Sequence, residues 1–479
     1  MKMMKTVTAL ALTLALLVSA LPMAVSADGK GDFDKNDRID TNDVRLLMNS
    51  LAKGKDVTLT QRLWADMDMD SKLSTTDARK LLSAVMMDSI APVTNYAKPT
   101  GEDWWGENSV ALLGDSISWG AGTSGGISEY SYVSYVKKAI QNYNSGKMNY
   151  GFVQAYTKQW AQGTNYTDSE EIFSWPSHTG WDETNNGNRL VKFGFQSVTP
   201  WSLLTFKLRS QYVNEYKYFT VYYHTEPGAG SFALANGSGG EVPYADGKAT
   251  GYIPTNGNSA ETKRTKFFKF SDCPKDSNGI PEIRICHGGT TEPVTITGVG
   301  CYKELPNTGG YVTFNSYSRG GAMLSELSYK VLEQAAKADT LIMSLGYNDM
   351  VWASNAGYSR EDFINRIDYL IEKCNENGTQ VVVNDFTWSN YNTISPYTGW
   401  NATMQAELDW RAENFSLHLR RLAEETGGVY VDHEAILGTD AIIPNLPDTV
   451  HPNNAGHKLI GQNVVAALGL TDYFTEEWK

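Results

Sequence analysis

The stretch Asn108-Ser-Val-Ala-Leu-Leu-Gly114-Asp115-Ser116-Ile117 decides the fold of this chain. Its apolar run predicts a buried strand that ends at Gly114-Asp115-Ser116, and a helical pattern follows at Tyr132–Tyr143. A turn from a strand into a helix exposes the serine hydroxyl at the carboxyl edge of a sheet and leaves backbone N–H groups free there. Ser116 is therefore a candidate nucleophile, although Gly-Asp-Ser alone occurs in many turns.

The same alternation of strand and helix continues in the last third of the chain. Strands are predicted at Tyr311–Ser318, Thr340–Leu345, Gln380–Val383 and Val429–Asp432. Helices are predicted at Ala322–Ala336, Arg360–Asn375, Ala402–Glu425 and Ala455–Leu468. Strands that alternate with helices indicate a parallel sheet covered on both faces, so the expected fold class is α/β.

Polar residues that suit ester hydrolysis accompany these elements. His451 can remove the proton of Ser116 during attack and can later protonate the leaving alcohol. Asp448, three residues earlier, can hold the imidazole in the required tautomer. Ser116, His451 and Asp448 are therefore the candidate catalytic set.

Other interpretations of the polar residues stay open. Asp448 can be a plain turn residue, and Asn348 can cap the helix that follows it. His433 and His457 are rival bases, but one follows a strand and the other lies inside a helical pattern, so we expect both to be structural. Asp115 is expected to have a turn or hydrogen-bonding role because its side chain points away from that of its neighbour.

Four sequence blocks together resemble the SGNH (GDSL-type) hydrolase family. They are Gly114-Asp115-Ser116, Gly320, Gly346-x-Asn348 and Asp448-x-x-His451, in this order. The resemblance covers residues 104–149 and 308–479 and implies a flavodoxin-like α/β/α sandwich. It also implies an oxyanion hole made of the N–H groups of Ser116 and Gly320 and the side-chain amide of Asn348. No metal or other cofactor is expected in the chemistry.

Residues 150–307 separate the two parts of this resemblance. Strand-like stretches occur at Ser202–Arg209, Lys217–His224, Lys266–Phe270, Glu282–Cys286 and Val294–Val299. Turns rich in Gly, Asn and Ser divide them and no helical period is evident, so we expect an inserted β-sandwich. Carbohydrate-binding modules often have this architecture, but so do inert spacers and cleft walls, and the fold alone does not decide between them.

An internal duplication occupies residues 28–87. The loop Asp32–Asp43 is matched by Asp66–Asp77, 34 positions later, and a helical run follows each loop. Oxygen ligands at loop positions one, three, five, seven and twelve can wrap a calcium ion, with position seven contributing its carbonyl. The expected ligands are Asp32, Asp34, Asn36, Arg38, Asp43, Asp66, Asp68, Asp70, Lys72 and Asp77. A solvated acidic surface is the simpler alternative.

A calcium loop followed by a helix, without a leading helix, resembles the type I dockerin repeat. The resemblance implies structural Ca²⁺ and a cohesin module of a scaffolding protein as partner. Partner choice would involve Thr41-Asn42 and Thr75-Thr76. Asp37 and Ser71 depart from the family, which usually has glycine at that turn. The implied setting is a cellulosome, and the implied substrate is the plant cell wall.

The N-terminus has the pattern of a secretory leader. Lys2 and Lys5 precede an apolar stretch, Val7–Val18, and small residues offer a cleavage site after Ala27. The apolar stretch is shorter than the ~20 residues that a membrane anchor needs, so we expect a secreted protein. Residues 88–103 hold two prolines and small polar residues, and are expected to be a linker.

Composition limits the choice of ligand. The 54 acidic residues outnumber the 41 basic ones and give a net charge of −13, which argues against nucleic-acid binding. The 13 Trp and 26 Tyr suit stacking on sugars as well as a large core. Three tryptophans that follow predicted strand ends, Trp119, Trp352 and Trp388, are expected to bind substrate. One disulfide bridge among Cys273, Cys286 and Cys301 stays open, while Cys374 lies alone on a predicted helix.

These observations predict a secreted serine esterase that removes acetyl groups from a plant polysaccharide, with xylan favoured. Other SGNH activities, such as feruloyl esterase, lipase or thioesterase, are alternatives within the hydrolases. A carbohydrate-binding protein with a vestigial hydrolase domain is the alternative from another class. No nucleic acid and no membrane is expected as a partner.

Overall fold

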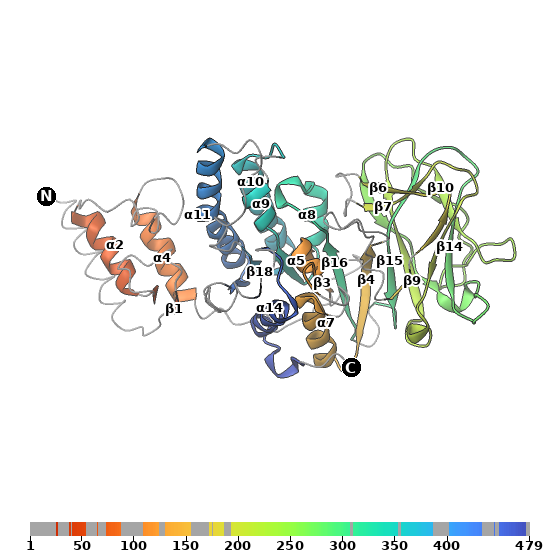
Figure 1. The fold of residues 1–479 in the computed structure, drawn as a ribbon, viewed down its shortest axis with the longest axis horizontal. Coiled ribbons are helices and arrows are strands. Elements are labelled where there is room, and N and C mark those ends of the chain that lie inside the picture. The colour runs from red at the N-terminus through yellow and green to blue at the C-terminus, as the bar shows by residue number, and fades with distance from the viewer. Residues whose placement is uncertain are drawn as a thin grey trace.

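The computed structural model describes residues 25–26, 38–39, 41–53, 65, 73–87, 109–123, 130–154, 172–174, 176–185, 193–306, 310–352, 356–386, 402–433, 445 and 450–475. Figure 1 shows helices and a sheet in the middle of the molecule and a region made of strands at one end. Most of the expected leader, the linker and most calcium-loop positions lie outside the described residues.

A parallel sheet forms the centre of the molecule. Its strands are β4 (Met148–Gln154), β16 (Val312–Ser318), β3 (Ser109–Gly114), β17 (Thr340–Ser344), β18 (Gln380–Asp385) and β19 (Val429–Asp432), in this spatial order. All neighbouring pairs among these six strands are parallel, as predicted. From β16 to β19 the order is the doubly wound 2-1-3-4-5, in which ligands bind where the winding reverses. That switch point lies between β3 and β17.

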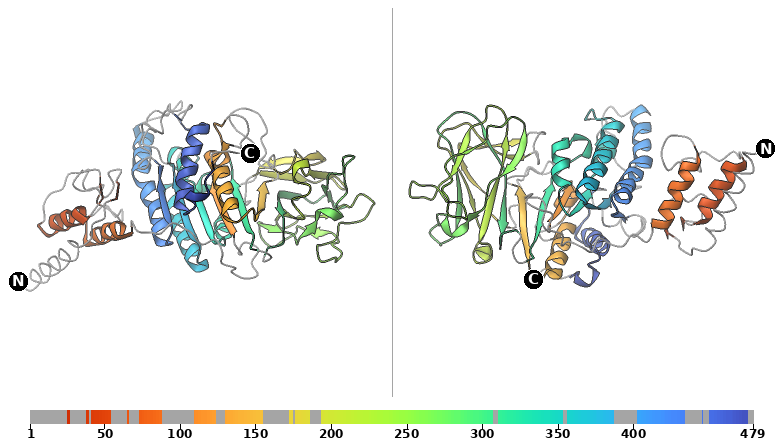
Figure 2. Two further views of the ribbon diagram at one scale, coloured as in Figure 1. Left: turned by 90° about the horizontal axis from the view of Figure 1, so that it is seen from below. Right: turned by 180° about the vertical axis from the view of Figure 1, so that it is seen from behind.

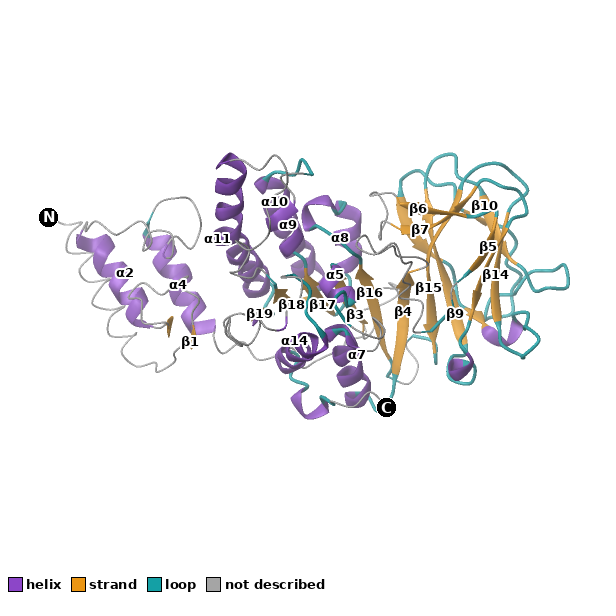
Figure 3. Ribbon diagram, viewed as in Figure 1, coloured by secondary structure: helices purple, strands orange, loops and turns teal. Residues whose placement is uncertain are grey.

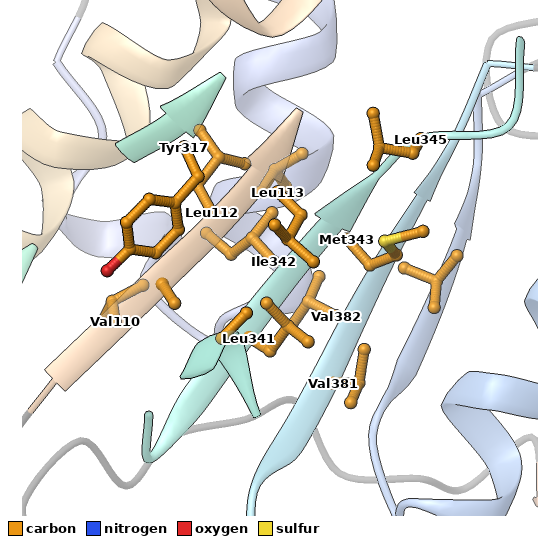
Figure 4. Packing of buried hydrophobic residues seen from close by; sticks show 14 of the residues in the cluster. Val110, Leu112, Leu113, Tyr317, Leu341, Ile342, Met343, Leu345, Val381 and Val382 are labelled. Atoms are coloured by element: carbon orange, nitrogen blue, oxygen red, sulfur yellow. The ribbon is translucent and has the colours of Figure 1, made fainter. Parts of the chain in front are cut away.

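The central strands are apolar because both faces of the sheet are covered. Every residue of β3 and β17 is buried, and Figure 4 shows side chains such as Leu112, Ile342 and Val382 packed together across neighbouring strands. The register pairs Leu113 with Met343 and Gly114 with Ser344. The carboxyl ends of β3 and β17 therefore lie at the same level of the sheet edge.

Helices cover the two faces of this sheet. They are α5 (Ser116–Trp119), α7 (Tyr132–Tyr143), α8 (Tyr329–Ala335), α9 (Tyr347–Trp352), α10 (Arg360–Asn377), α11 (Ala402–Glu425) and α14 (Asn454–Ala467). The helix α14 packs on α7, while α10 packs between α8 and α11, and the two groups lie on opposite sides of the strands (Figures 1 and 2). This arrangement agrees with the prediction that helices cover both faces of the parallel sheet.

Further strands lie beyond β4. They are β5 (Ser177–Thr179), β6 (Asp182–Asn185), β7 (Phe193–Ser197), β8 (Leu203–Lys207), β9 (Tyr218–Thr225), β10 (Ser231–Leu234), β11 (Ile253–Pro254), β12 (Glu261–Arg264), β13 (Phe268–Lys269), β14 (Glu282–His287) and β15 (Val294–Tyr302). Short 3₁₀ turns occur at η2 (Ser210–Tyr212), η3 (Phe270–Asp272), η4 (Leu324–Glu326) and η7 (Thr471–Tyr473). In Figure 3 the part of the chain from β5 to β15 is drawn mostly as strands and loops.

The strand-rich region is continuous with the central sheet, which departs from the separate unit that the sequence suggested. The strand β15 pairs antiparallel with β4 on one edge and with β9 on the other, so one sheet of twelve strands runs through both regions. A second sheet has the order β11-β10-β14-β8-β5. Side chains from both sheets, such as Phe206 and Val221, share a second buried cluster. The boundary expected at residue 150 therefore falls inside β4. The sequence did not predict this, because the alternation of side chains along a strand does not show which strands it pairs with.

Two helices follow the duplicated loops, as the sequence predicts. They are α2 (Thr41–Lys53) and α4 (Thr75–Met87), and they share a small core that includes Val44, Leu47 and Leu81. A short antiparallel pair joins β1 (Val25–Ser26) to β2 (Arg38–Ile39). In the part of the chain that the structure describes, no helix has the length and apolar character needed to cross a membrane.

Candidate active site

The turn after β3 presents Ser116 at the sheet edge. The Oδ1 atom of Asp115 accepts a hydrogen bond from the N–H of Ile117 at 2.9 Å and so caps the short helix α5. Gly120 then ends the helix with a φ of 94°. Ser116 is half-buried, while both of its neighbours in sequence are buried. The turn therefore leaves the serine as its accessible polar side chain.

His451 lies next to Ser116, although the two residues are far apart in sequence. The distance from Nε2 of His451 to Oγ of Ser116 is 2.9 Å, which is a hydrogen bond. A nucleophile and a base at this separation can exchange the proton that ester attack requires. Asp448, the third predicted member, lies outside the described residues, and its role stays a prediction.

Gly122 allows the two catalytic loops to approach each other. A Cβ atom at this position would lie 2.4 Å from the carbonyl oxygen of Pro452 and 3.0 Å from Cβ of His451. Its φ of 91° also favours glycine. The sequence reasoning missed Gly122, because only the folded chain shows which loop it faces.

Gly320, the expected oxyanion donor, follows a residue that is hydrogen-bonded to the carboxyl end of β3. Ser318 is in register with Gly114, and the N–H of Arg319 donates to the carbonyl of Gly114 at 3.1 Å. A Cβ on Gly320 would meet no atom of the described residues within 4 Å, so this part of the chain leaves space beside it. We call residues 319–326 the oxyanion loop.

Asn348 joins the turn after β3 to the oxyanion loop. Its Nδ2 atom donates to Oδ2 of Asp115 at 3.2 Å and to the carbonyl oxygen of Ala322 at 3.1 Å. An amide nitrogen carries two hydrogens, so both are used within the protein. Asn348 therefore positions the two loops here, and it would have to release one partner to reach an oxyanion.

Asp349 fastens the same loop from the next position of α9. Its carboxylate accepts hydrogen bonds from the N–H groups of Leu324 and Ser325, each at 2.7 Å, and from the Ser325 hydroxyl at 2.5 Å. Its carbonyl accepts a bond from Nη1 of Arg411 at 2.9 Å. Burial raises the pKa of the Asp349 carboxyl. The sequence analysis missed this residue, whose adjacency to Asn348 was the available indication.

A buried ion pair closes the oxyanion loop on itself. Arg319 pairs with Glu326, and Oε1 of Glu326 also accepts the N–H of Met323 at 3.1 Å. Burial lowers the pKa of Arg319 to about 10. The turn between them needs Gly321, which has a φ of 69°. The loop therefore holds its shape before any substrate binds.

Asp115 is an interior carboxyl beside the catalytic pair. Burial raises its pKa to about 7, against the opposing effects of its hydrogen bond from Ile117 and of the nearby charge on His451. Its two oxygens bond to Ile117 and Asn348, respectively. This placement agrees with the hydrogen-bonding role expected from the sequence.

The rival bases His433 and His457 are structural, as predicted. Nδ1 of His457 accepts the N–H of Tyr132 at 3.3 Å, so its Nε2 donates to the carbonyl of Ala121 at 3.1 Å. His433 bonds through its two ring nitrogens to Asn384 and Asn463. Burial lowers the pKa of His457 to about 4 and that of His433 to about 3, so both stay neutral near pH 7.

The predicted tryptophan platform is wrong at Trp119. Its side chain is only 1% exposed, because α5 turns it into the protein rather than toward the rim. Trp388 and the side chain of Trp352 lie outside the described residues, although Trp352 does end α9 at the sheet edge. Their part in substrate binding stays a prediction.

Two of the ten expected calcium ligands have described side chains. Asp43 and Asp77, at the twelfth positions of the two loops, are buried in the first turns of α2 and α4. Oδ2 of Asp77 accepts the N–H of Ser74 at 2.7 Å. Buried carboxylates at these positions fit the donor set of a hard cation. Among the described residues, which omit most loop positions, no group of three candidate metal ligands occurs.

The four cysteines carry free thiols. Cys273 and Cys301 lie in the second buried cluster, and Cys374 lies in the main core. Burial raises the pKa of Cys374 to about 12, which keeps its thiol protonated near neutral pH.

Comparison with known proteins gives one family match. Residues 302–459 match the model of the GDSL-like Lipase/Acylhydrolase family, a segment that holds the oxyanion loop, Asn348 and His451. Ser116 precedes this segment, and the fold brings it to His451. The search of curated proteins gives no match.

Three solved structures have low similarity to this chain. The protein YXIM of Bacillus subtilis has 12% identity over 66% of this chain and 98% of its own, with a TM-score of 0.28. The salicylyl-acyltransferase SsfX3 from a tetracycline biosynthetic pathway has 12% identity over 61% and 95%, with a TM-score of 0.26. The acetyl xylan esterase Est2A from the rumen bacterium Butyrivibrio proteoclasticus has 10% identity over 64% and 100%, with a TM-score of 0.20. Likenesses of this size carry no argument about substrate. Residues 302–459 are thus similar to the GDSL-like Lipase/Acylhydrolase family.

Proposed function

We propose that this protein is a serine esterase that removes acetyl groups from a plant cell-wall polysaccharide, with xylan as the favoured polymer. The observation that carries the proposal is the 2.9 Å hydrogen bond between Nε2 of His451 and Oγ of Ser116. It occurs at the switch point of a parallel sheet, beside the space that the described residues leave at Gly320, in a chain whose residues 302–459 are similar to the GDSL-like Lipase/Acylhydrolase family. This arrangement favours a working hydrolase over a vestigial one.

The reaction follows from these groups. Oγ of Ser116 attacks the acetyl carbonyl carbon while Nε2 of His451 accepts its proton. The N–H groups of Ser116 and Gly320 would bind the resulting oxyanion. His451 then protonates the sugar oxygen as its bond to carbon breaks, which leaves an acetyl-enzyme. Attack by a water molecule, with the same proton transfers, releases acetate.

The proposed setting rests on the N-terminal duplication. The two matched loops, each followed by a helix, support a calcium-binding dockerin that docks on a cohesin module of a scaffolding protein. Calcium would be held by the expected ligands, including the buried carboxylates of Asp43 and Asp77, and would stabilise the fold of this segment. The expected leader supports secretion, and a cellulosomal location supports a plant polysaccharide as substrate.

Acetate release from a panel of polymers tests the proposed substrate. Purified protein is incubated with acetylated xylan, acetylated mannan, acetylated pectin and feruloylated arabinoxylan, and the Ser116→Ala variant is the control. We expect acetate release from acetylated xylan and none from the control. Release of ferulate alone would contradict the proposed acetyl specificity, and no hydrolysis of any polymer or of p-nitrophenyl acetate would contradict the esterase itself.

A further inference from the structure

Two aromatic side chains are exposed together on the strand-rich region. Trp201 is 62% exposed and Tyr252 is 47% exposed, and their ring centroids lie 6.4 Å apart at an angle of 71°. Tyr143 and Tyr473 form another pair of exposed rings, with centroids 5.2 Å apart, but these rings are less open, at 41% and 38% exposed. Of the large exposed apolar side chains that the structure describes, Trp201 is the most open. Trp201 and Tyr252 are called the aromatic pair below.

The backbone at Trp201 is strained. The N–H of Ser202 donates to the carbonyl of Thr199 at 3.2 Å, which closes a turn with Pro200 and Trp201 at its centre. The φ of Trp201 is 63°, at a turn position that glycine or asparagine usually occupies. A left-handed conformation costs a bulky residue about 1 kcal/mol. Because the ring is also exposed and lies outside the buried clusters, core packing does not account for tryptophan at this position, which points to an external contact.

The same turn holds the indole in a fixed place. Oγ of Ser197 accepts the N–H of Thr199 at 3.0 Å and bonds to Oγ of Ser202 at 2.7 Å. The carbonyl of Ser202 accepts the N–H of His287 at 2.9 Å, which ties the turn to β14. The ring lies over Gly289, where a Cβ atom would be 2.6 Å from Cζ2 of Trp201. An immobilised ring loses little entropy when it binds a ligand.

We propose that the aromatic pair is a second polysaccharide-binding site, which stacks on the apolar faces of neutral sugar rings; this rests on the proposed function for the choice of polymer. A protein interface of standard size buries about 800 Å² on each partner. In the described part of residues 172–306, only Val198 joins the pair as a large exposed apolar residue. A small aromatic surface with the exposed Thr199 close in sequence suits one or two sugar rings better than a protein.

The aromatic pair belongs to a different sheet from the candidate active site. Trp201 leads into β8 and Tyr252 leads into β11, and both strands are in the five-stranded sheet. Ser116 and His451 follow or flank strands of the twelve-stranded sheet. Binding at the pair would retain the enzyme on its polymer without contact with the reacting ester. The expected effect is therefore on polymer retention and on KM for polymer, and not on small-ester hydrolysis.

Affinity electrophoresis in gels that contain soluble acetylated xylan tests this site. The full chain carries Ser116→Ala so that the polymer is not deacetylated, and Trp201→Ala, Tyr252→Ala and Tyr329→Ala are added singly. Tyr329, 44% exposed on α8, is the matched control for loss of an exposed ring. We expect at least tenfold weaker retention for Trp201→Ala, a smaller loss for Tyr252→Ala and no change for Tyr329→Ala.

Trp201→Gly separates binding from a structural role. Glycine adopts a φ of 63° freely, so this variant should unfold at the same temperature as the parent or higher. The variant should no longer be retained by xylan. When Ser116 is kept, Trp201→Gly should have the same kcat/KM for p-nitrophenyl acetate as the wild-type protein. A fall in unfolding temperature together with unchanged retention would show that Trp201 is structural.

Several other results would overturn the proposed second polysaccharide-binding site. Retention that is unchanged in both Trp201→Ala and Tyr252→Ala would overturn the site, as would a parent protein that xylan does not retain at all. Self-association seen by sedimentation and lost in these variants would overturn it in favour of a second copy of the chain. The proposed function fails separately, if the parent is retained through Trp201 but the protein with Ser116 intact releases no acetate.

Discussion

Asp115 and Ser116 are neighbours with opposite surroundings. The carboxyl is fully buried with a pKa raised to about 7, whereas the hydroxyl reaches the open edge of the sheet and bonds to His451. The buried carboxyl therefore shapes the turn, and the half-buried hydroxyl is available for chemistry. The Gly-Asp-Ser block predicted this division of roles, but only the fold shows that Asn348 binds the carboxylate.

Asp115→Asn should change how stability depends on pH. In the unfolded chain this carboxyl has an ordinary pKa of 3.8, and in the fold its pKa is about 7. Between these values the unfolded state loses its proton first, so rising pH destabilises the wild-type fold by roughly 4 kcal/mol in total. Relative to wild type, the variant should gain stability from pH 4 to pH 7 and then level off. Urea unfolding of both proteins at several pH values measures this difference, and a difference independent of pH would refute the assignment.

Asp349→Asn should reduce catalysis through the oxyanion loop. An amide cannot accept all three bonds that the carboxylate takes from Leu324 and Ser325, so the loop should shift and kcat should fall by ~10-fold or more. Asp339→Asn is the matched control, since Asp339 accepts the N–H of Ser109 at 2.8 Å at the far end of β3. Both variants should lose stability, but only the first should lose kcat on p-nitrophenyl acetate. Equal kcat values for the two variants would remove the positioning role.

At the scale of elements, the site depends on loops that approach each other closely. The loop after α5 meets the loop before α14 at Gly122, and the turn after β16 meets the start of α9 through Ala322 and Asn348. The strand end at Gly114-Asp115-Ser116, the block before the last helix and the family resemblance predicted Ser116, His451 and Gly320, respectively. They could not identify Gly122 or Asp349, whose roles arise from contacts between loops.

Gly122→Ala should displace His451. The new Cβ would lie 2.4 Å from the backbone oxygen of Pro452, so one loop must move, and a misplacement of about 1 Å can cost ~100-fold in rate. Gly146→Ala is the control, because Gly146 has a similar φ of 84° but open space around it. Gly146→Ala should lose about 1 kcal/mol of stability, because alanine is strained at this φ, and should keep its kcat. If the two variants had the same kcat, close approach at Gly122 would not matter for catalysis.

At the scale of the molecule, the parallel sheet was predictable and its continuation was not. Apolar runs such as Val110–Leu113 indicate strands buried on both faces, and their alternation with helices indicates parallel pairing. The alternating strands of residues 193–302 predicted sheets, but not that β15 would extend the central sheet through β4. Which strands pair depends on the sheet edges that the rest of the fold leaves free, and the sequence of a single strand does not indicate those edges.

Calcium removal should affect the N-terminal segment alone. Chelation should lower the helicity of α2 and α4, because binding at such loops also supplies folding free energy. Hydrolysis of p-nitrophenyl acetate should stay unchanged, since Ser116 and His451 lie outside this segment. Circular dichroism and a kinetic assay, each with and without a chelator and then with added calcium, measure both effects. Loss of hydrolysis that calcium restores would contradict this separation.

The central claim is that Ser116 forms the acyl-enzyme with His451 as its base. The most direct measurement is mass spectrometry of the protein after reaction with a fluorophosphonate, in which Oγ bonds to phosphorus and fluoride leaves. The account predicts one adduct per chain, on Ser116, with loss of esterase activity in proportion, and much slower labelling of His451→Ala. An inactivating adduct on another residue, or wild-type turnover by Ser116→Ala, would contradict it.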